Sequence, residues 1–296
     1  MPKLLPDQTF YPSPTMAMQA PAETLAYVAL LNPDPAANDA LAVLDVDLAS
    51  PGYGAQIARV DMPHAGDELH HFGWNACSSC LCPNSPHPHM QRRYLVVPGM
   101  RSSRIHILDT APNPRQPRLV KVIDADEIIR KTGYSRPHTA HCGPDGIYVN
   151  ALGDASGDGP GGIFVLDAET FEIKGPWEKE RGPQRLSYDF WWHLGHDTLI
   201  TSEWGTPNMV ENGVNPDLLL GRQVWQCAAR LGSEWAPSSA EARAGARVSD
   251  GAGVASCARS ERDVRLRRRR HEPQGSFVID LDVASRRERR VRVARA

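Results

Sequence analysis

Short runs of alternating apolar and polar residues recur through the first three quarters of the chain, and turn signals rich in Pro, Gly, Asn and Asp separate them. Such runs are typical of β-strands. One segment, 124–132, has a helical pattern, and Asp124 is its candidate N-cap. The chain is therefore predicted to be all-β, with strands at 24–31, 40–46, 55–61, 93–98, 103–109, 118–123, 146–152, 163–167, 171–177, 187–192 and 198–204.

Three of these strands end in an apolar pair followed by Asp45, Asp109 or Asp167, and each is followed by a turn and a second strand. The aspartates are 64 and 58 residues apart. A strand-turn-strand repeat of this kind indicates a β-propeller, although ordinary blades are nearer about 40–50 residues, so loop insertions are needed. A β-sandwich is the alternative for so many short strands. The regular repeat favours the propeller.

Composition divides the chain into three parts. Residues 1–22 are Pro-rich and are predicted to form an extended N-terminal arm, and residues 23–222 contain the predicted partial β-propeller. Residues 1–222 carry 17 Lys and Arg against 26 Asp and Glu, whereas residues 223–296 carry 16 Arg against 9 acids. This difference in net charge indicates that residues 223–296 do not belong to the same domain as the residues before them.

The segment 223–296 contains no Lys, Tyr, Met, Asn or Thr and is rich in Arg, Ala, Ser and Gly. A basic tail of this kind can bind nucleic acid, but we do not expect that here. An Arg-rich and Ala-rich composition also results when a GC-rich gene is read out of frame. Shifted codons for this segment allow strand-like strings with aromatic and β-branched residues. We therefore interpret 223–296 as a disordered tail translated out of frame after a frameshift near Gln223.

Two clusters of histidine and cysteine carry the candidate chemistry. The stretch 67–82 holds adjacent histidines, two acids and three cysteines, and the stretch 137–142 holds two histidines and a cysteine. Imidazole and thiolate are the preferred ligands of copper, zinc and iron. We therefore predict one metal site assembled by folding, with His70, His71, His138 and His141 as its ligands.

Several roles in this predicted site remain open. Adjacent histidines on a regular strand point to opposite faces, so His70 and His71 can bind one metal only where the backbone is irregular. Cys77 and Cys80 form a Cys-x-x-Cys pair that could act in catalysis, bind metal or form a disulfide. Cys142 is predicted to be a packing thiol or one that supports a ligand without binding the metal. The acids of the first cluster and Glu203 could relay protons or orient imidazoles, but they are predicted to be solvated loop residues.

Several motifs resemble the selenium-binding protein / methanethiol oxidase family. The resemblance rests on Glu68-Leu-His-His-Phe-Gly-Trp-Asn-Ala-Cys-Ser-Ser-Cys80, on His138-Thr-Ala-His-Cys142, and on the motifs 102–105, 152–162, 167–172, 188–191 and 201–204, and it runs in order from about Leu25 to Arg222. It implies about three to four blades of a seven-bladed propeller, with the remainder of the ring absent. The tail from about residue 222 does not match.

The resemblance implies a copper-dependent oxidation in which methanethiol, dioxygen and water give formaldehyde, hydrogen sulfide and hydrogen peroxide. A small thiol and dioxygen are then the expected partners, with Cys77 and Cys80 as catalytic candidates. Because about half of the propeller is expected, a non-catalytic selenium-binding or metal-binding fragment is the alternative. Family members that bind selenium carry a cysteine where this chain has Gly54, so selenium binding there is not expected. We expect no membrane segment and a cytoplasmic location.

Overall fold

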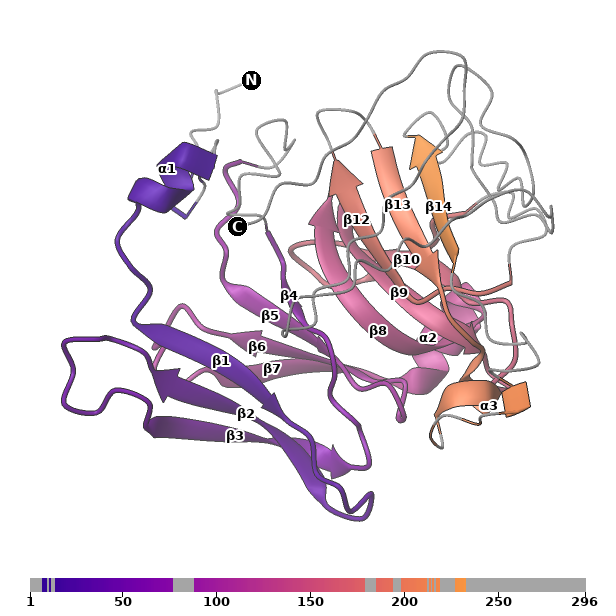
Figure 1. The fold of residues 1–296 in the computed structure, drawn as a ribbon, viewed down its shortest axis with the longest axis horizontal. Helices are drawn as coiled ribbons and strands as arrows, with labels where there is room; N and C mark the ends of the chain where they lie inside the picture. The colour runs from indigo at the N-terminus through magenta and orange to yellow at the C-terminus, as the bar shows by residue number, and fades with distance from the viewer. Residues whose placement is uncertain are drawn as a thin grey trace, which may run out of the picture.

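The structure is a computed structural model, and it describes residues 7–9, 11, 14–76, 88–178, 185–193, 198–211, 213, 215, 217–218 and 227–232. Within these residues the strands form four antiparallel sheets that follow one another along the chain (Figure 1). No helix among the described residues is both long and apolar enough to cross a membrane. The sequence-based assignment to the all-β class is confirmed.

Each sheet is built from strands that are consecutive in the chain. The first sheet contains β1 (Leu25–Leu30), β2 (Asn38–Asp45) and β3 (Gln56–Ala65). The second contains β4 (Gly73–Trp74), β5 (Tyr94–Pro98), β6 (Ile105–Asp109) and β7 (Arg118–Ile123). The third contains β8 (Tyr134–Gly143), β9 (Gly146–Asp154), β10 (Gly162–Leu166) and β11 (Ile173–Pro176). The fourth contains β12 (Asp189–His193), β13 (Thr198–Glu203) and β14 (Cys227–Gly232).

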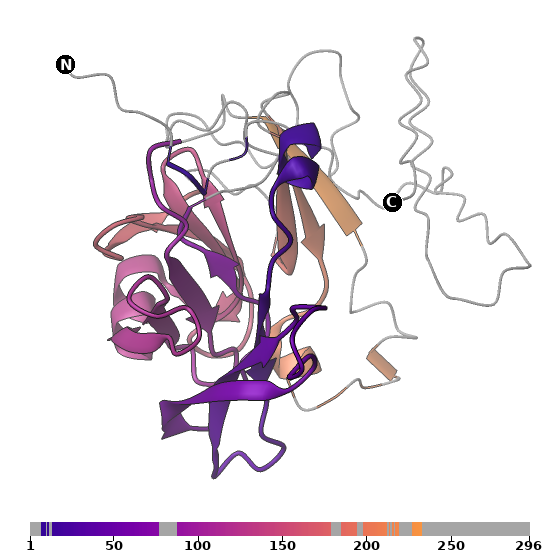
Figure 2. The same ribbon diagram turned by 90° about the vertical axis from the view of Figure 1, so that its left-hand side faces the viewer.

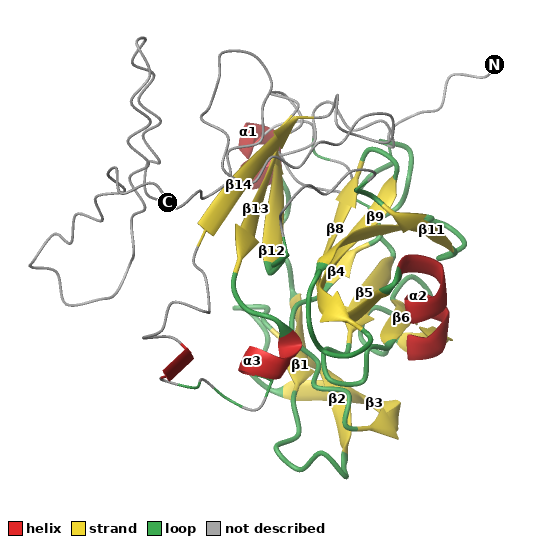
Figure 3. Ribbon diagram, turned by 90° about the vertical axis from the view of Figure 1, so that its right-hand side faces the viewer, coloured by secondary structure: helices red, strands yellow, loops and turns green. Residues whose placement is uncertain are grey.

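Among the described residues, the three labelled helices α1, α2 and α3 lie outside the sheets (Figure 3). The predicted helix is α2 (Ala125–Thr132), and it packs against β8 and β11. Asp124 is its N-cap residue, although its side chain makes no capping hydrogen bond. The helix ends at Gly133, whose φ of 77° is in the left-handed region that glycine adopts without a steric penalty. The other two helices are α1 (Pro14–Gln19) and α3 (Pro207–Val210).

The internal repeat is visible in the hydrogen bonds of its aspartates. The carboxylates of Asp45, Asp109 and Asp167 each accept a hydrogen bond from the backbone amide two residues later, at 3.1, 3.0 and 3.0 Å. This Asx-turn replaces a backbone turn and reverses the chain after β2, β6 and β10. The same local chemistry therefore follows the corresponding strand in three successive sheets.

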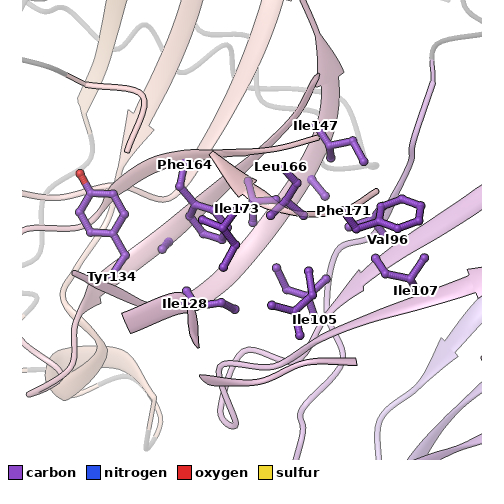
Figure 4. Close-up of a cluster of buried hydrophobic side chains, with 14 of the residues drawn as sticks. Val96, Ile105, Ile107, Ile128, Tyr134, Ile147, Phe164, Leu166, Phe171 and Ile173 are labelled. Carbon is purple, nitrogen blue, oxygen red and sulfur yellow. The ribbon is translucent and has the colours of Figure 1, made fainter. Parts of the chain in front are cut away.

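Three apolar clusters lie between neighbouring sheets. The largest joins the second and third sheets and is centred on Ile105, Ile107, Ile147 and Phe164, with Ile128 of α2 (Figure 4). Because side chains alternate across a strand, β6 and β9 contribute to two clusters each. The smaller clusters are Leu41, Met62, Leu69, Leu95, Val97 and Leu108 between the first two sheets, and Tyr148, Ile163, Val165, Trp177, Phe190 and Leu199 between the last two.

Three sequence-based predictions are wrong in detail. The arm predicted to be extended contains α1, since Pro14 is tolerated in a first helical turn and Met, Ala and Gln favour helix after it. The cluster 137–142 lies on strand β8, a strand that is missing from the sequence-based prediction. Residues Cys227–Gly232 of the tail form β14, so the prediction of disorder fails for these six residues. Strand β14 pairs with β13 through backbone hydrogen bonds, so an unusual side-chain composition does not prevent this strand from forming.

Candidate metal and thiol site

The predicted site lies where the first strands of three successive sheets meet. Strand β8 contacts both β4 and β12. Figure 2 shows the sheets from a second side, and Figure 3 labels these three strands. His70 and His71 lie in the segment just before β4, whereas His138 and His141 lie on β8. Tyr188 immediately precedes β12. Folding therefore brings together residues from separate sheets, as the two clusters in the sequence predict.

Irregular backbone directs these imidazoles to one place. Glu68 and Arg136 have φ values of 56° and 57°, and each lies two residues before a histidine of the site. Such left-handed conformations are uncommon for residues other than glycine. In β8 the pairing register also shifts between Pro137 and Ala140, and this irregularity contains His138. The irregular backbone needed for adjacent histidines to converge is therefore present.

Buried Asn150 of β9 supports the irregular part of β8. Its Oδ1 atom accepts a hydrogen bond from the backbone amide of Thr139 at 2.9 Å, and its Nδ2 atom lies 3.3 Å from Oγ of Ser187. The amide of Thr139 falls where the ladder between β8 and β9 is interrupted. Asn150 thus satisfies a buried donor that the register shift would otherwise leave without a partner.

Gly73 permits the close approach of β4 and β8. A Cβ atom at this position would collide with the backbone carbonyl oxygen of Ala140. Any other residue would therefore force these two strands apart. His71 precedes Gly73 by two residues, and its ring centroid lies 4.5 Å from that of His138. The glycine therefore contributes to bringing the two histidine clusters together.

Three of the four predicted histidines form one cluster. Nδ1 of His70 lies 3.4 Å from Nε2 of His138. The ring of His71 joins this pair, with its centroid 6.2 Å from that of His70 and 4.5 Å from that of His138. His138 is buried, whereas His70 and His71 are exposed. The cluster is thus open to solvent and has His138 at its base.

The contacts of Nδ1, the ring nitrogen that faces away from His70, set the orientation of the His138 ring. Nδ1 lies 3.1 Å from the backbone carbonyl oxygen of Tyr188 and 3.0 Å from Oγ1 of Thr139. A carbonyl can only accept, so Nδ1 carries the proton and Nε2 presents a lone pair to His70. The ring of Tyr188 also packs against His138, with centroids 4.6 Å apart and planes tilted by 34°. Metal-binding histidines usually have this outer hydrogen bond to a carbonyl.

The pKa values of His138 and His70 are lowered, which favours the neutral, metal-binding form of these two imidazoles. Burial, together with the neighbouring charges of His71 and His70, lowers the pKa of His138 to about 3. Burial also lowers the pKa of His70, and the nearby Glu68 carboxylate opposes this change. A neutral imidazole keeps the lone pair that a metal requires.

Two donors in this cluster have a separation that suits a metal. Two nitrogens bound tetrahedrally at about 2.0–2.1 Å lie about 3.3–3.4 Å apart, which matches the distance between His70 and His138. No group of three or more His, Cys, Asp or Glu side chains that could hold a metal ion is found among the described residues. The structure therefore presents a pair of facing donors with a third imidazole stacked beside it.

His141 is placed differently from the other three histidines. Its Nε2 atom lies 3.9 Å from Oδ1 of Asp189, and its ring meets Phe190 edge-on at 5.1 Å. Burial lowers the pKa of His141, Asp189 opposes this change, and His71 adds to it. His141 thus borders the cluster next to a carboxylate, and none of its described contacts is with the other three rings.

The predicted catalytic cysteines, Cys77 and Cys80, lie outside the described residues. Cys142 is disulfide-bonded, which corrects its prediction as a packing thiol. In the sequence it follows directly after His141, within the His138-to-Cys142 motif. The second histidine cluster is therefore bordered by an oxidised cysteine.

The prediction that the nearby acids are solvated loop residues is also wrong. Asp67 is fully buried, with its carboxylate 3.1 Å from Arg104 and 3.4 Å from the buried His106. The side chain of Glu68 is only 12% exposed. Glu203 lies on β13, and burial raises its pKa to about 7. Asp67 and Glu68 are thus held by charged neighbours, and Glu203 has a raised pKa.

Sequence reasoning missed two residues that position the cluster. Asn150 lies in an apolar strand, and a buried amide inside such a run is a signal that could have identified it. Tyr188 lies in a motif that carried the family resemblance but was not singled out as a site residue. Both act through backbone hydrogen bonds, which a side-chain motif does not reveal.

Comparisons with known proteins identify the family of this chain. The model of the 56 kDa selenium-binding protein family (SBP56) matches residues 4–229. The chain is 44% identical over 209 residues to selenium-binding protein 2 of Mus musculus and 43% identical to methanethiol oxidase of Homo sapiens. Each alignment covers 70% of this chain and 43% of the relative. The chain therefore spans less than half the length of these relatives.

A solved structure is similar as well. The hypothetical selenium-binding protein ST0059 from Sulfolobus tokodaii matches with a TM-score of 0.68 and 55% sequence identity. The match covers 72% of this chain and 47% of that protein. At this identity the likeness extends beyond a shared fold to a shared family.

Proposed function

Because the chain belongs to the 56 kDa selenium-binding protein family, we propose that it is a portion of a copper-dependent methanethiol oxidase. In the proposed reaction, methanethiol, dioxygen and water give formaldehyde, hydrogen sulfide and hydrogen peroxide. The support is the identity of 43% to the human protein that bears this name, together with the histidine cluster. The metal and the reaction are both part of the proposal.

We propose that the four sheets are consecutive blades of a seven-bladed propeller. The strands of each sheet are consecutive in the chain, and the Asx-turn repeats in three of the sheets. In a propeller, the first strand of each blade lines a central channel, which is where β4, β8 and β12 would lie. The histidine cluster would then face that channel.

The observation that carries the metal proposal is the facing pair, Nδ1 of His70 and Nε2 of His138. With the proton of His70 on Nε2, the lone pairs of His70 Nδ1 and His138 Nε2 face each other at 3.4 Å and repel unless a cation lies between them. Burial disfavours a proton on His138, so a metal ion is the cation that suits the pair. Bound copper would supply one-electron chemistry and affinity for thiolate sulfur. His71 is the nearest additional imidazole.

The residues around the pair have distinct proposed roles. The exposure of His70 and His71 would admit a molecule as small as methanethiol. Glu203 is the proposed proton carrier, since a carboxyl with a pKa of about 7 can both accept and release a proton near neutral pH. It adjoins Trp204, whose ring lies 6.4 Å from that of Tyr188. Cys77 and Cys80 remain candidate thiols that would exchange with the substrate.

The test combines copper binding with turnover. The purified chain, the His138→Asn variant and the control His64→Asn are titrated with copper and then assayed for methanethiol loss and peroxide release. His64 is an exposed histidine on β3 and lies outside the cluster. We expect His64→Asn to behave as the parent, and His138→Asn to lose at least about tenfold in copper affinity. Equal copper binding by all three proteins would refute the site.

A second candidate function follows from the length of the match. Because the chain spans 43% of its curated relatives, the alternative is a non-catalytic metal-binding fragment. Copper binding that depends on His138, without consumption of methanethiol, would support this alternative. Consumption of methanethiol with release of hydrogen peroxide would exclude it.

A further inference from the structure

Glu68 has an unusual backbone conformation next to the histidine cluster. Its φ of 56° lies in the left-handed region, which is unfavourable for a residue with a side chain. The conformation persists because the surrounding contacts fix it. The carbonyl of Glu68 accepts a hydrogen bond from the amide of Met100 at 3.0 Å. Local strain maintained in this way is common where a side chain must be aimed.

Both neighbours of Glu68 are fixed independently. The buried carboxylate of Asp67 lies 3.1 Å from Arg104, and its backbone carbonyl accepts the amide of Arg101 at 3.1 Å. On the other side, the amide of Leu69 donates to the buried carboxylate of Asp39 at 2.8 Å. Glu68 is thus held between two buried residues, while its own side chain points to the cluster.

The carboxylate of Glu68 connects a cation to an imidazole. Its Oε2 atom lies 2.7 Å from the guanidinium of Arg101, and its Oε1 atom lies 3.6 Å from Nε2 of His70. The opposite nitrogen of the same ring, Nδ1, faces His138. Glu68 therefore lies next to Nε2 of His70, whereas His138 lies next to Nδ1 of the same ring.

We propose that Glu68, held by Arg101, is a positioning residue that keeps the proton of His70 on Nε2 and leaves Nδ1 free to bind a metal. A carboxylate attracts the N–H of a metal-binding imidazole and fixes both its tautomer and its orientation. Without Glu68, the proton moves to Nδ1, where it donates to Nε2 of His138. Neither Nδ1 of His70 nor Nε2 of His138 is then free to bind a metal. The inference rests on the proposed metal function.

The tautomer is measured first, in the metal-free protein. Long-range ¹⁵N–¹H NMR of the histidine rings distinguishes a proton on Nδ1 from one on Nε2. We expect Nε2–H at His70 in the parent and a shift toward Nδ1–H in Glu68→Met and in Arg101→Gln. The control is Glu127→Gln on α2, which removes a carboxylate paired with Lys131 at 2.8 Å and leaves the site intact.

Copper(II) affinity is measured next, by competition with a chelator of known affinity. Loss of an outer-shell carboxylate typically lowers metal affinity about 10–100-fold, and we expect that decrease for Glu68→Met but not for Glu127→Gln. If Glu68→Met does not fold, Arg101→Gln tests the same contact from the surface, since Arg101 is 44% exposed. An unchanged His70 tautomer in the folded variants overturns the role of Glu68. Failure of the parent to bind copper instead overturns the proposed function.

Discussion

The buried imidazole of His138 makes the stability of this protein depend on pH. The ordinary pKa of histidine is 6.5, and in the folded chain burial is the main cause that lowers it to about 3 for His138. Between these two values the unfolded chain binds a proton that the folded chain excludes. Stability is therefore fully present above the unfolded pKa and is lost as the pH falls.

The size of this effect follows from the two pKa values. Each unit of difference corresponds to about 1.4 kcal/mol, so the complete loss over the window is roughly 5 kcal/mol. Between pH 6.5 and about pH 4.5 the expected loss is about 2 kcal/mol, since only part of the window is crossed. His70 and His141 also have lowered pKa values and add to the loss in the parent. A comparison of variants is therefore needed to isolate His138.

The informative variant is His138→Asn. Its amide can still donate to the carbonyl of Tyr188, but it cannot titrate. Urea unfolding followed by tryptophan fluorescence at pH 6.5 and 4.5 gives the free energy of unfolding at both pH values. We expect the parent to lose about 2 kcal/mol more than the variant, which is a difference of roughly 0.5–1 M urea in the shift of the midpoint.

The control is His64→Asn on β3, which removes an exposed imidazole and should leave the pH dependence of the parent unchanged. Equal losses of stability for the parent and His138→Asn would show that the folded chain accepts a proton at His138 without cost. That result would refute the argument that this imidazole is buried in its neutral form.

Three other substitutions test the packing around the site. Gly73→Ala should separate β4 from β8, lower copper affinity and reduce the melting temperature, whereas retained affinity would show that the two strands adapt. Asn150→Leu should cost about 1–3 kcal/mol in urea unfolding, because the amide of Thr139 loses its acceptor, and an unchanged midpoint would contradict that accounting. Phe164→Ala should cost about 3–5 kcal/mol by the same assay, and Val120→Ala, at a site that is 47% exposed, should cost far less.

Much of this fold could be read from local patterns. Residues 118–123 were predicted as a strand and form β7 with the same bounds, since their alternation matches a half-buried strand. The helix α2 begins one residue after its predicted N-cap, Asp124. Strand β8 was missed because two histidines, a threonine and a proline hide its pattern. Its pairing with β9 supplies the missing information.

The pattern of residues alone predicted four histidines as metal ligands, in two clusters about seventy residues apart. It also determined the all-β class, because the period of apolar residues depends only on local geometry. It did not determine which nitrogen of each imidazole is free. That choice depends on partners distant in the chain, such as Tyr188 for His138.

Folding places three of the four predicted ligands in one cluster and separates the fourth, His141, from them. Three rings meet because Gly73 allows two strands to approach and because left-handed residues direct the histidines, while His141 turns to Asp189. Burial likewise decided that His138 is neutral and that Glu203 has a raised pKa. Desolvation is a property of the folded surroundings, so no short motif contains it.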